Sequence, residues 1–279
     1  MEKPRLGHIK FINCLPLAYS LQYGGFAADL EVCSDVPSIL NSQIVNGKLD
    51  VSPVSSIVYA RHHEKFFVIP NVSISANGAL QSILLVSKRP IEALNKAKVA
   101  LTAKSETSHC LLKIVLHDAY QAQPEYFITD LSTETEVLNH ADAVLFIGDD
   151  ALYHYHHRHE GLYYYDVGAE WKKLTGLPMV YAVWVTRREF AFQSPVLLQN
   201  AYERVTGGFQ YGLDHLDQAI AAYVDKLPFS AQQVHHYLTL LNWSFTSDHE
   251  RALLTFYERA YHIGLIEKVP AIEFAGVKK

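Results

Sequence analysis

Short apolar runs alternate with helical patterns through the first two thirds of the chain. Runs rich in Val, Ile, Leu and aromatic residues, bounded by Gly, Pro or small polar residues, predict buried strands. The predicted strands are 6–12, 30–33, 51–54, 78–87, 99–102, 126–129, 143–147 and 179–186. Apolar residues at three-to-four spacing predict helices. The helices predicted between these strands are 16–22, 36–46, 55–61, 107–120, 133–139 and one that begins at 149.

Helical periodicity alone continues from Pro195 onward. The predicted helices there are 196–211, 216–224, 231–241 and 249–262. Strand–helix–strand repetition predicts βαβ units and mostly parallel sheets, so the expected fold class is α/β. Two of the β runs are long and bracket the middle block, as two crossovers between lobes would. We therefore expect lobe I to comprise 1–88 plus 181–279 and lobe II 89–180, with a ligand in the interlobe cleft.

The composition fits this picture and excludes several classes of protein. The chain has 279 residues, of which 49% are hydrophobic and 19% charged, which suits two lobes or one large α/β unit. A net charge of −5 provides no basic field for nucleic acid or an anionic membrane. No segment has the length of a membrane span or the apolar stretch of a signal peptide. Because Cys14, Cys33 and Cys110 are odd in number and far apart, we expect no disulfide framework and a reducing cytoplasm.

Four short segments share one design, in which a β run leads through small polar residues into a helix. They are 11–16, 51–56, 101–108 and 146–150. Each helix start exposes backbone N–H groups that lack intrahelical partners, and Ser, Thr and Asn add side-chain donors. The four segments therefore predict an anion site that needs no arginine. The candidate binding residues are Ser55, Ser56, Ser105, Thr107, Ser108, Gly148 and Asp149, with Asn13 in the first segment.

Each of these residues also has a simpler explanation when taken alone. Ser55 and Ser105 could be ordinary helix caps, and Asn13 could be a turn residue. Asp149 could stabilise the positive end of its own helix. Four such loops at strand ends are less easily explained by capping alone. The pattern supports an anion site but does not name the ligand.

Other chemistry-bearing patterns are weaker. The histidine-rich tract 154–159 lacks Cys or acidic partners at matching spacing, and its Arg158 opposes a cation. We interpret this tract as a solvated loop or helix end rather than a metal site. The three tyrosines 163–165 indicate a packed strand, because no basic stripe accompanies them. The sequence has no phosphate-binding loop, dinucleotide fingerprint or GxSxG elbow, and we predict no metal site.

The polar loops also carry a resemblance to a known family. Residues 7–16 (GHIKFINCLP) and 47–60 (GKLDVSPVSSIVYA) resemble the opening motifs of the chorismate dehydratase family, which acts in the futalosine pathway of menaquinone biosynthesis. The family's further motifs resemble 78–85 (GALQSILL), 101–108 (LTAKSETS), 147–152 (IGDDAL) and 171–184 (WKKLTGLPMVYAVW). These matches run in family order up to about residue 185. The helical tail carries no motif.

The resemblance implies a type II periplasmic-binding-protein-like fold and a lyase without cofactors. Such an enzyme converts chorismate, a dianion, to 3-[(1-carboxyvinyl)oxy]benzoate and water. We assign Asn13 and Ser82 as catalytic residues that position the substrate and assist the leaving hydroxyl. No matched motif presents a His or Lys base. We therefore hypothesise that the enolpyruvyl carboxylate of the substrate removes the C3 proton, with Asp149 as the rival base.

Two other interpretations remain open at this point. A cytoplasmic small-anion solute-binding protein would share the fold, although a transport protein normally needs an export signal. The sister enzyme of the same pathway yields a dihydroxynaphthoate, and its family pattern lacks an opening like 13–16. A purely structural protein would not explain four donor loops. All three retained interpretations predict a small-molecule partner, foremost chorismate, and neither nucleic acid nor membrane.

Overall fold

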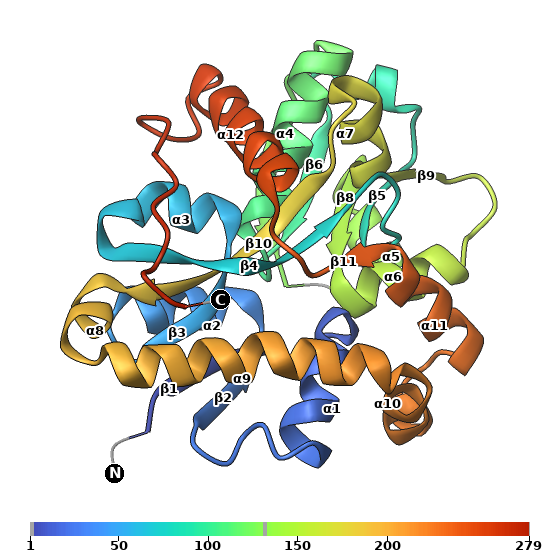
Figure 1. The fold of residues 1–279 in the computed structure, drawn as a ribbon. Coiled ribbons are helices and arrows are strands. Elements are labelled where there is room, and N and C mark those ends of the chain that lie inside the picture. Colours follow the sequence, from blue (N-terminus) through green and yellow to red (C-terminus); the bar gives the residue numbers. More distant parts are fainter. Residues whose placement is uncertain (1–2, 131–132, 279) are drawn as a thin grey trace.

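Two β-sheets organise the computed structural model of the chain, which describes residues 3–130 and 133–278 (Figure 1). The strands of the first sheet are β1 (Arg5–Ile9), β2 (Glu31–Asp35), β3 (Val51–Ser55), β4 (Phe66–Ala76), β10 (Met179–Arg187) and β11 (Leu241–Asn242). Their spatial order is β11-β4-β10-β3-β1-β2. β1 is parallel to β2 and β3, whereas β10 is antiparallel to β3 and β4. The first sheet is therefore mixed.

The second sheet is also mixed. Its strands are β5 (Ile83–Ser87), β6 (Lys98–Thr102), β7 (Glu125–Thr129), β8 (Ala143–Ile147) and β9 (Tyr163–Asp166). Their spatial order is β7-β6-β8-β5-β9. β6 is parallel to β7 and β8, and β5 is antiparallel to β8 and β9. Every residue of β5 and β8 is buried, which explains why both strands are continuous apolar runs.

Helices cover both sheets, and the helices that follow β10 pack against elements of both. The helices are α1 (Leu15–Tyr23), α2 (Pro37–Val45), α3 (Ser56–His62), α4 (Glu106–Tyr120), α5 (Glu134–Leu138), α6 (Gly148–His156), α7 (Val167–Thr175), α8 (Arg188–Gln193), α9 (Pro195–Asp214), α10 (Leu216–Tyr223), α11 (Ala231–Thr239) and α12 (Ser247–His262). α9 packs on α1, while α12 lies beside α4 (Figure 1). Arg259 of α12 pairs with Asp118 of α4 at 2.5 Å. No helix in 3–130 or 133–278 is long and apolar enough to cross a membrane.

The chain crosses between the sheets twice. The first crossing lies within 77–82, between β4 and β5, and the second within 176–178, between α7 and β10. The predicted boundary at residue 88 therefore falls after β5, although that strand already pairs within the second sheet. We propose that the lobes divide at these two crossings. The first lobe would then hold both ends of the chain.

Several features differ from the sequence-based expectation. The expectation of mostly parallel sheets was wrong, because β5 and β10 each enter their sheet directly from the other sheet and pair antiparallel. The hydrophobic pattern did not indicate β4. Its apolar run is interrupted at Asn71, which has a left-handed φ of 65°, and its pairing with β10 shifts register twice. The pattern also missed α7 and α8, which follow their preceding strands without a loop.

Candidate anion-binding site

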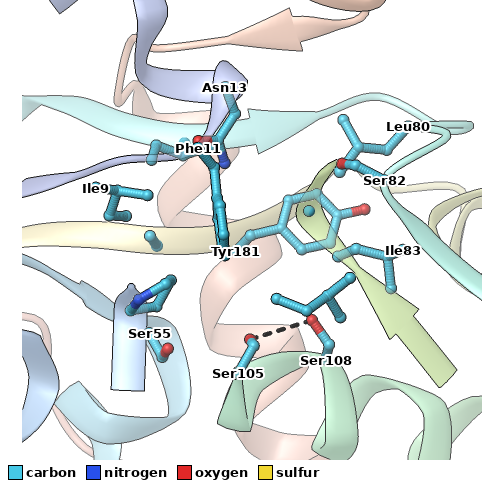
Figure 2. Close-up of a pocket in the computed structure, with 15 residues that line it drawn as sticks. Ile9, Phe11, Asn13, Ser55, Leu80, Ser82, Ile83, Ser105, Ser108 and Tyr181 are labelled. Carbon is cyan, nitrogen blue, oxygen red and sulfur yellow. Dashed lines mark hydrogen bonds between the residues drawn. The ribbon is translucent and has the colours of Figure 1, made fainter. Parts of the chain in front are cut away.

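A pocket lies between the two sheets, where the predicted loops meet (Figure 2). Its empty volume, including the part open to solvent, is about 530 Å³. Six of the nine predicted site residues line it, namely Asn13, Ser55, Ser82, Ser105, Ser108 and Gly148. Segments far apart in the sequence therefore converge on one cavity. The first sheet supplies the Ser55 side and the second sheet the Ser105 side.

The walls of this pocket carry no charged side chain among the residues that the structure describes. Apolar side chains form most of the surface, as in many small-molecule sites, and the polar groups are hydroxyls and one amide. The apolar and aromatic lining residues are Ile9, Phe11, Pro37, Ile74, Leu80, Ile83, Ile147, Tyr181 and Ala182. A ligand with negative charge would therefore be held by neutral hydrogen-bond donors.

Ser55 ends β3 and begins α3, but its hydroxyl does not cap that helix. The side chain of Asn41 on α2 makes two hydrogen bonds to it. The Ser55 backbone N–H donates to Asn41 Oδ1 at 3.0 Å, and Asn41 Nδ2 donates to Ser55 Oγ at 3.1 Å. All these groups are buried. The simpler explanation of Ser55 as a helix cap therefore does not account for its hydroxyl.

Ser82 lies at the end of the first crossing and is held from two sides. Its Oγ accepts a hydrogen bond from the Tyr237 hydroxyl at 2.9 Å, and its carbonyl accepts from Gly148 N–H at 2.8 Å. The preceding residues are fixed by Asp166, whose Oδ2 accepts from the N–H groups of Leu80 at 2.8 Å and Gln81 at 2.5 Å. The loop that presents Ser82 is thus anchored to α6, α7 and the tail helix α11.

Ser105 and Ser108 lie at the start of α4, on the opposite side of the pocket from Asn13 in Figure 2. Their hydroxyl oxygens are 3.2 Å apart, and either oxygen can donate to the other. Ser105 is the N-cap residue of α4, yet its side chain makes no capping hydrogen bond. One hydroxyl proton is shared within the pair. The other proton has no acceptor among the residues that the structure describes, so it can be donated to a ligand.

Asn13 lies in the short 3-10 helix Ile12–Cys14 that follows β1. Its backbone carbonyl accepts a hydrogen bond from Trp243 Nε1 at 2.8 Å, which fixes the turn. Its side-chain Oδ1 is buried and has no hydrogen-bond partner in the described parts of the chain. Buried polar atoms are rarely left unpaired, so this amide is expected to complete its hydrogen bonds with a ligand.

Gly148 begins α6 in the left-handed region, with φ at 61°. A Cβ at this position would lie 3.1 Å from two ring atoms of Phe11, which is another pocket residue. Glycine therefore allows both the backbone conformation and the close approach of the Phe11 ring across the two sheets.

The other three predicted binding residues do not line the pocket. Ser56 donates its hydroxyl to the carbonyl of Val180 at 2.7 Å, and Thr107 Oγ1 accepts from the N–H of Ile57 at 3.2 Å. Both side chains are buried, and their hydrogen bonds link separate secondary structure elements. Asp149 Oδ1 accepts from the Ile12 N–H at 3.2 Å and so links the two sheets beside the pocket.

Burial raises the pKa of Asp149 from its usual 3.8 to about 6, because the charged carboxylate loses solvation. The hydrogen bond from Ile12 opposes this rise, Asp150 adds to it, and Lys104 opposes it. Lys104 itself forms an ion pair with Asp150. The carboxyl group of Asp149 is therefore poised to titrate near neutral pH, although it makes a structural hydrogen bond rather than facing the cavity.

Three residues of the site were missed by sequence reasoning. Tyr181 lines the pocket, and its buried hydroxyl has no hydrogen-bond partner in the described part of the chain. Asn41 and Tyr237 contact the pocket serines from behind. Tyr181 stands within a quoted family motif, but Asn41 and Tyr237 lie in helical patterns that give no signal of a site.

The histidine-rich tract is the end of α6 and the turn after it, as interpreted from the sequence. His154 differs from the expectation of a solvated residue: it is buried and stacks on Phe146, with ring centroids 4.1 Å apart. Among the described residues, no group of three or more His, Cys, Asp or Glu side chains is placed to hold a metal ion.

The fold and the pocket together define a class of protein. Two α/β units with a pocket between their sheets are the architecture of the periplasmic-binding-protein-like fold. The periplasmic aliphatic sulphonate binding protein of Escherichia coli has this fold: it aligns with a TM-score of 0.68 and 15% identity, over 98% of this chain and 91% of that chain. The predicted fold class is therefore confirmed.

Sequence comparison then places the chain within a family. Residues 4–262 match the family described as menaquinone biosynthesis. A chorismate dehydratase of Thermus thermophilus is 31% identical over 86% of this chain and 87% of that protein. A 1,4-dihydroxy-6-naphtoate synthase of the same bacterium is 25% identical over 97% and 98%. The chain belongs to the menaquinone biosynthesis family that includes chorismate dehydratase, which confirms the resemblance and supports the prediction of a hydro-lyase, an enzyme that removes water.

Proposed function

We propose that this protein is a chorismate dehydratase, which converts chorismate to 3-[(1-carboxyvinyl)oxy]benzoate and water. The single observation that carries the proposal is the uncharged pocket between the sheets, in which five predicted hydroxyl and amide residues converge. Membership of the family supports the choice of chorismate as substrate. The proposal includes a cytoplasmic enzyme whose chemistry needs no metal and no cofactor.

Chorismate presents two carboxylates, and the pocket presents neutral donors on both of its sides. Ser55 and the Ser105–Ser108 pair would hold one end of the dianion, while Asn13 and Ser82 would face the reacting carbons. Preorganised neutral donors stabilise an anion strongly in an enclosed site, because they need no reorganisation when charge develops. Loss of the C3 proton builds negative charge on the ring carboxylate. Donors at that carboxylate would therefore lower the barrier.

The base is proposed to be the enolpyruvyl carboxylate of the substrate itself. No described side chain that lines the pocket can accept a proton near neutral pH, because none is Asp, Glu, His or Lys. Expulsion of the C4 hydroxyl makes the ring aromatic and supplies the driving force. The task of the protein is then to hold the carboxylate close to the C3 hydrogen, as orientation alone can contribute a large part of the rate.

Asn13→Ala and Ser82→Ala test the two assigned catalytic residues. Each substitution should lower kcat by about 10²-fold, as expected for the loss of one preorganised donor. The assay follows the aromatic product by absorbance in purified protein. Ser56→Ala is a matched control, because its hydroxyl is buried and bonded to a carbonyl outside the pocket. Near-wild-type turnover in both pocket variants would contradict the assignment.

Asp149→Asn separates the substrate base from its rival. The amide can still accept the hydrogen bond from Ile12 but cannot remove a proton. If the substrate carboxylate is the base, this variant should keep kcat within about threefold of wild type, since no step passes through Asp149. A loss of kcat comparable to that of Asn13→Ala would assign the base to Asp149 instead.

Two other functions make different predictions for the same sample. A solute-binding protein would bind chorismate without forming an aromatic product. The sister activity is suggested by the 25% identity to a 1,4-dihydroxy-6-naphtoate synthase over 97% of this chain. It would leave chorismate unchanged and would yield a dihydroxynaphthoate from a different substrate. Product analysis by mass spectrometry distinguishes all three.

A further inference from the structure

Two serines of the pocket receive hydrogen bonds from buried residues that do not touch the cavity. Asn41 donates to Ser55 Oγ at 3.1 Å, and Tyr237 donates to Ser82 Oγ at 2.9 Å. Asn41 lies on α2 behind the Ser55 side of the pocket, while Tyr237 lies on α11 behind the Ser82 side. Both supporting side chains are almost fully buried. A polar contact of this kind needs an explanation, because burying it costs solvation.

The orientation of the Asn41 amide follows from its two partners. The backbone N–H of Ser55 can only donate, so the atom that faces it at 3.0 Å must be Oδ1. The NH2 group is then left to face Ser55 Oγ, where it can only donate. The Ser55 oxygen therefore accepts, and its own proton must point elsewhere. The described residues offer that proton no acceptor, and the pocket is the open direction.

The direction of the Tyr237 hydrogen bond follows from similar reasoning. The Tyr237 hydroxyl is buried, and Ser82 Oγ is the acceptor that the described residues provide for it. Burial raises the pKa of Tyr237, and the nearby Asp149 and Asp166 carboxyls raise it further. The hydroxyl therefore stays protonated and donates. Ser82 is left with a proton that no described side chain accepts, and Ser82 lines the pocket.

We infer that Asn41 and Tyr237 are positioning residues that direct the hydroxyl protons of Ser55 and Ser82 into the pocket. A serine hydroxyl alone can donate or accept, but these two are set as donors. The pocket would therefore select ligands that present acceptor atoms, such as carboxylate oxygens or a leaving hydroxyl oxygen, at two fixed points. This inference rests on the proposed function only for the identity of the ligand.

The test is a double-mutant cycle on Tyr237 and Ser82. Tyr237→Phe removes only the hydroxyl and should lower kcat about tenfold, the effect of losing about 1.4 kcal/mol of orientation. In a Ser82→Ala background the same substitution should leave kcat unchanged, because there is no hydroxyl left to orient. In the wild-type background KM should change less than kcat, since Ser82 is assigned to the leaving hydroxyl, and in the Ser82→Ala background KM should also stay unchanged.

A matched tyrosine controls for loss of stability. Tyr257 is also fully buried, and its hydroxyl donates to the Ser56 carbonyl at 2.8 Å, outside the pocket. Tyr257→Phe should lower the midpoint of urea unfolding by about as much as Tyr237→Phe, yet leave kcat unchanged. Equal losses of kcat from Tyr237→Phe in the wild-type and Ser82→Ala backgrounds would overturn the inference, as would no loss in either.

Asn41→Asp reverses the direction of the hydrogen bond between residue 41 and the Ser55 hydroxyl, rather than removing this bond. The carboxylate still accepts from the Ser55 N–H, but Ser55 must now give its proton to residue 41 and becomes an acceptor toward the pocket. KM should rise at least tenfold, with kcat less affected. In a Ser55→Ala background the rise should be smaller, because only the through-space repulsion of the added charge remains. The same rise in both backgrounds would overturn this half of the inference.

The inference and the proposed function can fail separately. If the wild-type protein does not turn over chorismate, the proposed function fails. The same cycles are then run on the affinity for isophthalate, a dicarboxylate, measured by calorimetry with wild-type and variant protein. Non-additive losses of affinity would uphold the positioning roles. Additive losses, or no binding of isophthalate by the wild type, would overturn them.

Discussion

Gly148→Ala perturbs the pocket where the start of α6, which follows the second sheet, meets Phe11, which follows β1 of the first sheet. Gly148 has a φ of 61°, a region that costs an alanine about 1 kcal/mol. The added Cβ would also lie 3.1 Å from two ring atoms of Phe11. The backbone cannot simply retreat, because Gly148 N–H is hydrogen-bonded to the Ser82 carbonyl at 2.8 Å. Relief must therefore displace Phe11 or Ser82, and both line the pocket.

Gly148→Ala has two separate costs, which are backbone strain at residue 148 and the close contact of the new Cβ with Phe11. Backbone strain alone should lower the melting temperature by about 2 °C in a chain of this length. Overpacking typically costs 1–3 kcal/mol, and displacement of pocket residues carries part of that into substrate binding. We expect kcat/KM for chorismate to fall by about tenfold. Initial rates of product formation and urea unfolding curves measure the two effects independently.

Gly264→Ala is the matched control for this prediction. Gly264 follows α12 with a φ of 74°, and a Cβ there would meet no atom of the described residues within 4 Å. Gly264→Ala should therefore show only the loss of stability that comes from backbone strain, with unchanged kcat/KM. The reasoning would be refuted if folded Gly148→Ala retained wild-type kcat/KM, or if Gly264→Ala lost as much activity.

Three further predictions concern single buried groups. Tyr181→Phe should raise stability by about 1 kcal/mol, because the buried hydroxyl has no partner among the described residues, while weakening substrate binding several-fold; unfolding and KM measured on one preparation check this. The pKa of Asp149 is raised from 3.8 to about 6, so its carboxylate lowers stability as pH rises through this window. Asp149→Asn should therefore raise the melting temperature at pH 7.5 but not at pH 4, and destabilisation at pH 7.5 would contradict the burial argument. Burial lowers the pKa of His8 from 6.5 to about 4, so His8 should contribute a loss of stability as pH falls between these values, a slope that His8→Gln should reduce.

The alternation of strands and helices was predictable because buried strands and amphipathic helices leave separate periodicities in the sequence. The end of β3 at Ser55 and the start of α4 after Ser105 were both expected within a residue or two. The prediction of mostly parallel sheets was wrong, because both sheets are mixed. The sequence of a strand does not reveal where the chain comes from. It looks the same for a strand that follows a helix of its own sheet and for one, such as β10, that enters from the other sheet and pairs antiparallel.

The convergence of loops on one pocket was predictable from strand-end chemistry, since loops at one edge of each sheet face the same cleft. Which hydroxyls enter the pocket was not. Ser55 and Ser56 are adjacent in the chain and share the same sequence context, but only Ser55 lines the cavity. Their difference depends on Asn41 and on the Val180 carbonyl, which are distant in sequence. Contacts of this kind exist only after the sheets have packed.

The fate of chorismate in a solution of the purified, chelator-treated protein decides whether the protein has the proposed activity. A chorismate dehydratase should convert chorismate to a single aromatic product, 3-[(1-carboxyvinyl)oxy]benzoate, with release of one water and without any added metal or cofactor. Mass spectrometry and absorbance identify this product. Tight binding of chorismate without product would contradict the proposed activity. Activity that appears only when a metal or cofactor is added would contradict the proposal that the chemistry needs neither.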